Sequence, residues 1–309
     1  MSKSKAKRPR WVNSDGSVTP IPGASDPGGL RDLYHIFLKV HWSTFLALLA
    51  AGYFSLNTVF ACLYMLAGPG GVPGVESFAQ AFNFSIQTFA TIGYGVLSPV
   101  STFANFVVAI ESFTGIVSVA LATGMIFARF SQPQARVLFS KKAVINTIDG
   151  TPQLRFRVRN QRGNRVIGAT VKLVLMRREI LPDGSVFNRF IDLKVVRDQT
   201  PLFMLSWVVM HPIDHDSPFY GVMPEELADY PIELVVTLTG LDGTTNQLIT
   251  AQSSYQPDDM VFGHRMEDVF LPGEDGKPTL HWHHFHAVRE LPEEHAMPEW
   301  VRNRKISAE

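Results

Sequence analysis

Two long apolar segments dominate the first half of the chain and predict a pair of membrane-spanning helices. Residues 42–67 carry no charged side chain, and residues 100–130 form a second apolar run. A helix over residues 42–67 would be about 39 Å long, enough to cross a hydrocarbon core of about 30 Å with some tilt. Trp42 and Tyr64 fall near the ends of the first segment, where interfacial aromatic anchors are expected.

The connection between these segments contains a third, shorter apolar stretch. Ser77 and Gln80 have the spacing of a capping box, so a helix is expected to begin there. Residues 78–90 are too few to cross the bilayer and too apolar for an exposed loop. This pattern predicts a re-entrant helix, which enters the membrane and returns to the same side.

From about residue 135 the pattern changes to short segments rich in β-branched and aromatic residues, separated by turn signals such as Asp149-Gly150 and Asp242-Gly243. Such spacing, without long helices in between, predicts a β-sandwich, with a short helical turn at residues 224–227. The expected strands include residues 154–159, 171–176, 186–196, 203–210 and 232–239.

The first 41 residues form a basic and Gly/Pro-rich arm that ends in an amphipathic pattern over residues 30–40. This pattern predicts a helix lying in the plane of the membrane interface, with a plain charged lead-in to the first span as the alternative. The arm carries seven Lys and Arg residues, the connection between the spans carries none, and four follow shortly after position 128. Both termini are therefore expected in the cytoplasm, with the chain in the plasma (inner) membrane.

These patterns divide the chain into an arm with an interfacial helix (1–41), a first span (42–67), an extracellular connection (68–99), a second span (100–131) and a cytoplasmic β-domain with a C-terminal tail (132–309). The formal net charge is zero, which gives no reason to expect a nucleic-acid partner.

The most informative residues end the re-entrant segment. Gly93 and Gly95 alternate with larger residues, which allows backbone conformations whose successive carbonyls face the same way. Non-helical backbone at membrane depth is tolerated where it is buried in protein or lines an aqueous path. Residues 91–95, hereafter the filter segment, also match the Thr-Val-Gly-Tyr-Gly filter of potassium channels except for Ile92.

The chain resembles the prokaryotic inward-rectifier potassium channels, the KirBac family, over nearly its whole length. The resemblance is carried by Phe-Ser-Ile-Gln-Thr-Phe-Ala-Thr-Ile-Gly-Tyr-Gly at 84–95, by Gly-Met-Ile-Phe-Ala-Arg-Phe at 124–130, by Ser-Trp at 206–207 and by Met-His-Pro-Ile-Asp at 210–214. It implies a potassium channel and not an enzyme, a homotetramer with an immunoglobulin-like cytoplasmic β-sandwich, and gating by ligands and lipid. No cofactor is implied besides the potassium ions in the filter.

Several site residues follow from this resemblance. Potassium would be held by carbonyls of the filter residues, which are Thr91, Ile92, Gly93, Tyr94 and Gly95, with the ions at the first four. Phe127 matches the bulky gate at the cytoplasmic end of the second span, with a lipid-facing or packing role as the alternative. Val119 occupies the place where strong rectifiers of animals carry an acidic residue, so rectification is expected to be weak. Thr123, one helical turn further, is expected to face the same cavity.

Glu111 is the one carboxylate within a span. On insertion scales such a group costs about 2.5–3.5 kcal/mol, so it is normally solvated or paired. Two placements stay open: holding the filter from behind, or facing the upper cavity and attracting cations.

Basic residues gather in the sequence where the second span meets the cytoplasmic domain. They predict an anionic-lipid or phosphoinositide site, with generic positive-inside topology as the alternative. The candidate residues are Lys39, Arg129, Arg136, Lys141 and Lys142.

The sequence also raises three alternatives to a potassium channel, which are an enzyme with a metal site, a tethered receptor and a non-selective cation channel. A histidine-rich segment at residues 281–286 raises the possibility of a metal site, but on a strand neither face offers three ligands, so a solvated polar strand is favoured. His211 and His215 are candidates for pH sensing at a tetramer interface. A tethered β-sandwich receptor would not need the filter segment, and a non-selective cation channel would be expected to depart from it.

Overall fold

The computed structural model describes residues 10, 13, 17, 33–133, 135–272, 277–292 and 297–306. The chain folds into two compact units. The helical unit spans Ser25–Gln132, and the β unit spans Pro133–Glu309 together with Met1–Ala24. Most of the basic arm lies outside the described residues, as does Asp275-Gly276, a further turn signal of the β-domain sequence.

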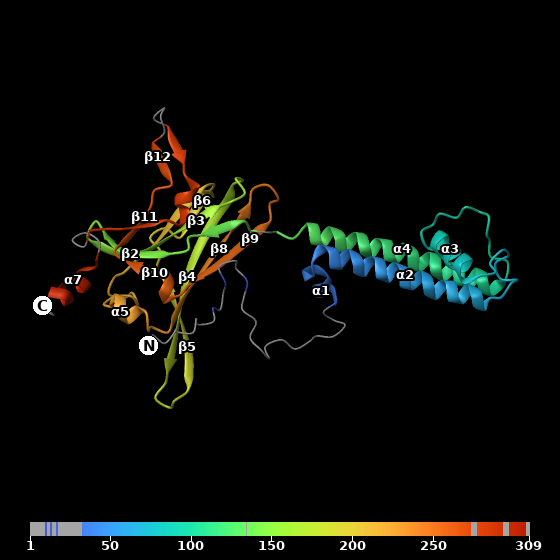
Figure 1. Ribbon diagram of the computed structural model, residues 1–309, viewed down its shortest axis with the longest axis horizontal. Coiled ribbons are helices and arrows are strands. Elements are labelled where there is room, and N and C mark those ends of the chain that lie inside the picture. The colour runs from blue at the N-terminus through green and yellow to red at the C-terminus, as the bar shows by residue number, and fades with distance from the viewer. Residues whose placement is uncertain are drawn as a thin grey trace, which may run out of the picture. The chain divides into compact units, whose positions relative to one another are not determined.

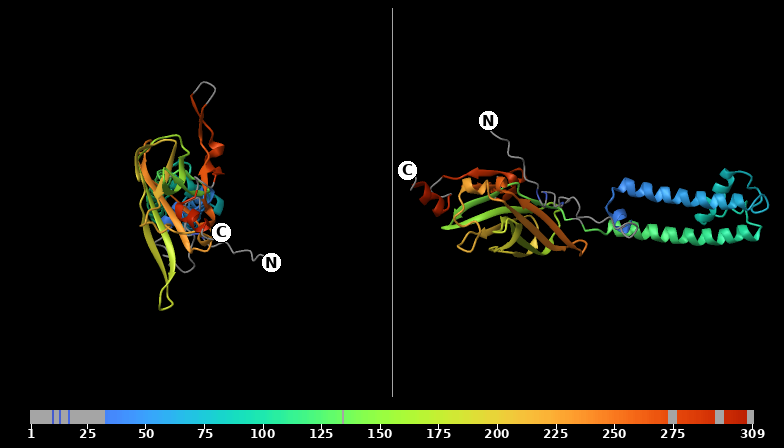
Figure 2. Two further views of the ribbon diagram at one scale, coloured as in Figure 1. Left: turned by 90° about the vertical axis from the view of Figure 1, so that its left-hand side faces the viewer. Right: turned by 90° about the horizontal axis from the view of Figure 1, so that it is seen from below.

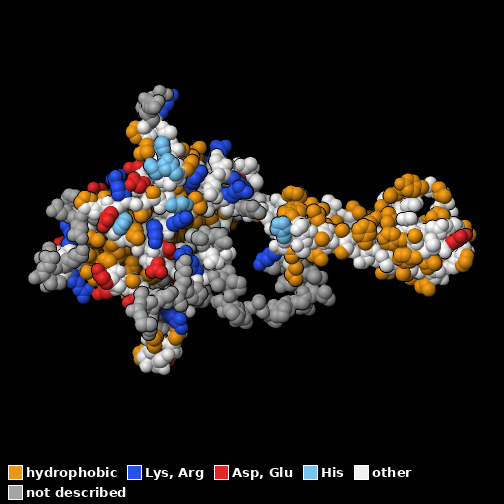
Figure 3. All heavy atoms as spheres, viewed as in Figure 1, with side chains coloured by type: hydrophobic (Ala, Val, Ile, Leu, Met, Phe, Trp, Pro, Cys, Tyr) orange, Lys and Arg blue, Asp and Glu red, His pale blue; other side chains and the backbone are white. Residues whose placement is uncertain are grey.

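Two long helices form the frame of the helical unit. They are α2 (Trp42–Leu66) and α4 (Thr102–Phe130), which lie side by side, preceded by the short α1 (Leu33–Lys39) (Figures 1 and 2). Both long helices are long and apolar enough to cross a membrane. Apolar side chains cover much of the face of this unit that Figure 3 shows, as expected for a surface that faces lipid rather than water.

The re-entrant segment forms α3 (Phe78–Phe89), packed against both long helices at one end of the unit. Its twelve residues span about 18 Å, well short of a bilayer. The predicted capping box is confirmed: the Ser77 hydroxyl accepts from the Gln80 amide, and the Gln80 side chain accepts from the Ser77 amide at 3.0 Å. Gly115 of α4 lies so close to the Phe89 carbonyl that an added Cβ would clash with it.

The main body of the β unit is two mainly antiparallel sheets packed face to face. The first has the order β1-β3-β2-β10 with β7 also on β3, and the second has the order β5-β4-β8-β9 with β6 also on β4. The strands of the first sheet are β1 (Val137–Phe139), β2 (Ala143–Ile148), β3 (Thr151–Asn160), β7 (Ser206–Pro212) and β10 (Met260–Phe262). Those of the second are β4 (Val166–Ile180), β5 (Val186–Leu193), β6 (Gln199–Phe203), β8 (Ile232–Asp242) and β9 (Leu248–Tyr255).

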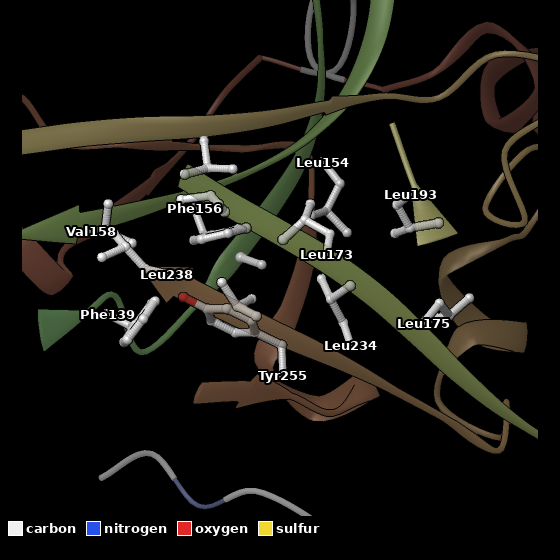
Figure 4. Packing of buried hydrophobic residues seen from close by; sticks show 14 of the residues in the cluster. Phe139, Leu154, Phe156, Val158, Leu173, Leu175, Leu193, Leu234, Leu238 and Tyr255 are labelled. Carbon is white, nitrogen blue, oxygen red and sulfur yellow. The ribbon is translucent and has the colours of Figure 1, made fainter. Parts of the chain in front are cut away.

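Side chains alternate between inward-facing and outward-facing along the strands, and the inward-facing ones form the core between these sheets. Leu154, Phe156 and Val158 of β3 point inward and meet Leu173 and other residues of the second sheet (Figure 4). The intervening β3 residues are polar, as period-2 patterning requires of a sheet with one core face. The predicted β-sandwich is therefore confirmed.

Smaller elements complete the β unit. They are α5 (Pro224–Leu227), the 3-10 turn η2 (Pro257–Asp259), the pair β11 (His264–Met266) and β14 (Val288–Glu290), the pair β12 (Phe270–Pro272) and β13 (Pro278–Leu280), the 3-10 helix η3 (Trp282–His286) and α7 (Glu299–Ile306). The turn expected at residues 224–227 is confirmed by α5. Asp149 and Gly150, both with positive φ, close the β2–β3 hairpin as expected.

Two strand predictions are wrong. Residues 203–210 are not one strand, because the chain bends at Met204 and Leu205, leaving β6 in the second sheet and β7 in the first. The histidine-rich segment is not a strand either, since η3 winds it into a 3-10 helix that buries Phe285. The alternation of apolar and polar residues does not reveal where a chain passes from one sheet to another, or where one buried aromatic residue fixes a short 3-10 helix.

Candidate ion pathway

The filter segment leaves the end of α3 in an unusual backbone conformation. The φ angles of Thr91, Gly93 and Gly95 are +57°, +54° and +81°, while Ile92 and Tyr94 keep negative values. Glycine adopts positive φ readily, but a β-branched residue does so rarely. Alternation of this kind turns successive peptide units so that their carbonyls face the same way.

Backbone hydrogen bonds show which way these carbonyls point. The Gln87 carbonyl of α3 accepts from the amide of Ile92 at 2.8 Å and from the amide of Gly93 at 3.3 Å. The peptide bonds are trans, so the carbonyl of each peptide unit points opposite to its N–H group. The carbonyls of Thr91 and Ile92, which belong to these two units, therefore face away from α3.

The filter segment is open to its surroundings within one chain. Ile92 and Tyr94 of this segment are 48% and 72% exposed, and Val96, directly after it, is 86% exposed. The C-terminal end of α3, which carries partial negative charge, lies directly before this segment and favours a nearby cation.

Glu111 of α4 is fully buried behind α3. Its Oε1 atom accepts from the Ser85 hydroxyl at 2.5 Å, and its Oε2 atom accepts from the Tyr64 hydroxyl. Assigning Glu111 to the cavity is therefore wrong, since neighbouring helices enclose the carboxyl group. Of the two placements left open by the sequence, the one in which Glu111 holds the filter from behind agrees with its contact to Ser85 of α3, and it stays a prediction.

Two partners of Glu111, Tyr64 and Ser85, and the Asn57 side chain beyond Ser85 were not identified as site residues from the sequence. Tyr64 is 2% exposed and bonds to Glu111, so its expected role as an interfacial anchor is wrong. Ser85 also lies 3.0 Å from the Oδ1 atom of Asn57, whose amide donates to the Tyr53 carbonyl. Polar residues inside apolar segments were the available signal, because intramembrane polar groups need partners.

Val119, Thr123 and Phe127 lie along one face of α4, at spacings of four residues. All three are exposed within one chain, Phe127 by 71%. The Thr123 hydroxyl donates to the Val119 carbonyl at 2.8 Å. This face can therefore line a shared cavity, as expected from the sequence, and the cavity and gate assignments of these three residues remain predictions.

Comparison with known proteins places the chain in a family. The profile of the inward rectifier potassium channel C-terminal domain matches residues 137–305, and an ion channel profile matches residues 36–132. The inward rectifier potassium channel Kirbac3.1 of Paramagnetospirillum magnetotacticum is 42% identical over 93% of this chain and 98% of its own length. The chain belongs to the inward rectifier potassium channel family.

Animal members of the inward rectifier family are more distant. The ATP-sensitive inward rectifier potassium channel 12 of Gallus gallus is 29% identical over 85% of this chain and 67% of its own length. The inward rectifier potassium channel 18 of Homo sapiens is 28% identical over 92% of this chain and 72% of its own length. The expected resemblance to prokaryotic inward rectifiers is confirmed, and the chain is a membrane-embedded channel protein rather than an enzyme.

The basic residues assigned to lipid in this inward rectifier chain have different environments. Arg129 donates to the carbonyls of Phe37 and Val40, and its guanidinium lies 4.7 Å from the Trp42 ring centroid. Lys142 donates to the Asp258 carbonyl at 2.6 Å. Lys39 and Arg129 belong to the helical unit, while Arg136, Lys141 and Lys142 belong to the β unit. The lipid assignment stays a prediction.

The histidines do not form a metal site within the described part of the chain, where no group of three or more His, Cys, Asp or Glu residues is arranged to hold a metal ion. The rings of His281, His283 and His284 do gather at the surface of η3, with centroids 4.1–5.9 Å apart. His211 is 3% exposed inside its own β unit, so it is not available to an interface between copies.

Proposed function

We propose that this chain is one subunit of a homotetrameric potassium-selective channel whose filter is residues 91–95. The observation that best supports this proposal is the backbone conformation of the filter segment, whose Thr91 and Ile92 carbonyls face away from α3. Four copies around an axis would place these carbonyls in rings. The exposed side chains of Ile92, Tyr94 and Val96 support this assembly, because neighbouring copies would cover them.

Conduction in this proposal needs no cofactor. Potassium loses its hydration water to the carbonyl oxygens of Thr91, Ile92, Gly93 and Tyr94, and crosses by displacement between adjacent sites. The partial negative charge at the C-terminal end of α3 stabilises the cation as it enters.

The same four-fold arrangement defines a cavity and a gate. Val119 and Thr123 line the cavity below the filter, and four Phe127 side chains close it by excluding water. Valine at 119 presents no charge to attract magnesium or polyamines, so rectification is weak.

Regulation in this proposal enters from the cytoplasmic side. Both termini lie in the cytoplasm, the chain resides in the plasma (inner) membrane, and the β unit biases the gate. Anionic lipids or phosphoinositides bind Lys39, Arg136, Lys141 and Lys142, with about 1 kcal/mol for each cation near the surface. Arg129 is bonded to backbone carbonyls in this structure and contributes mainly to the junction of α1 and α2.

Ion flux into liposomes tests the proposal. Purified full-length protein is expected to give a potassium flux that barium blocks and that sodium does not replace, and Gly93→Asp is expected to abolish it. A matched change at Gly70, an exposed glycine of the connection without positive φ, should leave the flux intact. Flux that ignores the cation, or that survives Gly93→Asp, would overturn the selective filter.

A further inference from the structure

A buried polar network lies inside the helical unit, where α3 packs against α2 and α4. It joins Asn57 and Tyr64 of α2, Ser85 of α3 and Glu111 of α4. Asn57, Ser85 and Glu111 have no exposed surface, and Tyr64 is 2% exposed. The network is therefore complete within one chain, and a neighbouring copy cannot reach it.

If Glu111 is ionised, the network has one hydrogen atom too few to satisfy all of its hydrogen-bond acceptors. The Ser85 oxygen lies 2.5 Å from Glu111 Oε1 and 3.0 Å from Asn57 Oδ1, and both of those atoms are acceptors when the carboxyl group is charged. Asn57 Oδ1 is identified as the oxygen because the other amide atom donates to the Tyr53 carbonyl at 2.8 Å. One serine hydroxyl carries a single hydrogen, so it cannot donate fully to both.

A proton on Glu111 supplies the hydrogen atom that the network otherwise lacks. Protonated at Oε1, the carboxylic acid donates to the Ser85 oxygen, which reverses the direction that this bond has when Glu111 is ionised. Ser85 then donates to Asn57 Oδ1, and Tyr64 donates to Oε2. Every polar atom of the four-residue chain of contacts then has a partner, which buried networks require.

Among the described residues of the helical unit, no cation lies near Glu111. The charged residues between positions 42 and 130 are Glu76, Glu111 and Arg129. Arg129 is 18 residues further along the same helix, about 27 Å away, and binds the carbonyls of Phe37 and Val40. A carboxylate enclosed by apolar helices without a cation nearby is strongly disfavoured.

We propose that Glu111 is a neutral carboxylic acid whose proton links α4 to α3 and α2, and that this link positions the filter. Ser85 lies two residues before Gln87, whose carbonyl holds the Ile92 and Gly93 amides. Shifting α3 would therefore shift the filter backbone directly. Glu111 is a positioning residue here, not an ion ligand, and this second part rests on the proposed filter function.

Infrared difference spectroscopy of the full-length channel in liposomes tests the protonation directly. The wild-type protein is expected to show the carbonyl stretch of a protonated carboxylic acid, shifted by exchange into D2O, and Glu111→Gln should remove that band. A spectrum at neutral pH in which this variant removes only carboxylate bands would overturn the proposal, whatever the flux measurement gives.

Flux variants test the positioning role. Glutamine can donate to Ser85 and accept from Tyr64, so Glu111→Gln is expected to keep the potassium-over-sodium preference and the wild-type dependence of flux on pH. Glu111→Ala and Ser85→Ala are expected to lose that preference, whereas Ser55→Ala, at an exposed position of α2, should not. If glutamine and alanine at 111 fail alike, or if the pH profiles diverge near neutral pH, Glu111 acts through its charge and the proposal fails. A wild-type protein without flux would instead count against the proposed channel function.

Discussion

Single residues decide whether the filter segment can form. Thr91 holds a φ of +57°, which for a β-branched residue is a strained conformation that persists only if its surroundings enforce it. The Thr91 amide is bonded to the Thr88 carbonyl, and the next two amides to Gln87. The end of α3 therefore supplies the constraint, and glycines at 93 and 95 limit further strain.

A buried histidine makes the stability of the β unit depend on pH. Burial lowers the pKa of His211, whose ring nitrogens lie 2.7 Å from the Lys194 carbonyl and 2.8 Å from the Ser217 hydroxyl. Because the unfolded chain binds a proton more readily, this contribution is full above the ordinary histidine pKa, about 6.5, and declines as pH falls below it. The slope from this one proton is at most about 1.4 kcal/mol per pH unit.

Unfolding of the full-length protein in detergent, followed by near-ultraviolet circular dichroism from about pH 7 to about pH 5, measures this effect. His211→Gln is expected to flatten the decline, and His215→Gln, at an exposed position, should leave it unchanged. Equal slopes in the wild-type and His211→Gln proteins would contradict the assignment.

At the scale of elements, α3 depends on its N-terminal cap. Replacing Ser77 by alanine removes the acceptor for the Gln80 amide, which typically costs about 1 kcal/mol. A lower thermal unfolding midpoint in detergent is expected, and Ser77→Asp should restore it because aspartate caps equally well. Failure of aspartate to rescue the alanine defect would show that Ser77 acts by another contact.

The C-terminal end of α1 depends on Arg129. Its guanidinium bonds to the carbonyls of Phe37 and Val40 and lies over the rings of Trp42 and Phe45. Lysine lacks the planar fork that makes these contacts together, so Arg129→Lys is expected to cost about 1 kcal/mol.

Hydrogen exchange followed by mass spectrometry checks this prediction. Amides of residues 36–45 should exchange faster in Arg129→Lys than in the wild-type protein, while Arg136→Lys, at an exposed position, serves as the matched control. Unchanged exchange would mean that the junction of α1 and α2 is held by apolar packing alone.

Much of the helical architecture could be predicted because its signals are local. The apolar segments gave both long helices, and Ser77 with Gln80 gave the start of α3. The break at Met204 and Leu205 could not be predicted, because each half of that segment pairs with a strand distant in sequence. Likewise, the site of Glu111 depends on Tyr64 and Ser85 from two other helices, and residue spacing cannot reveal such contacts.

At the scale of the whole molecule, the proposed pore exists only when four copies meet. Val119 is 60% exposed in one chain and would contribute one quarter of a ring. Val119→Asp would place four carboxylates in a low-dielectric cavity, where such rings raise the local concentration of a polyvalent cation by about tenfold or more. Spermine or magnesium on the cytoplasmic side is then expected to block outward potassium current strongly.

Planar-bilayer recordings with spermine on the cytoplasmic side measure this block, with Val119→Asn as a control of similar size and polarity but no charge. The asparagine variant should rectify as weakly as the wild-type channel, because the effect belongs to the ring of charge and not to the loss of valine. Block in both variants would point to altered packing of α4. Absence of block in a conducting Val119→Asp channel would place residue 119 away from the cavity, and with it the face of α4 that also carries Thr123 and Phe127.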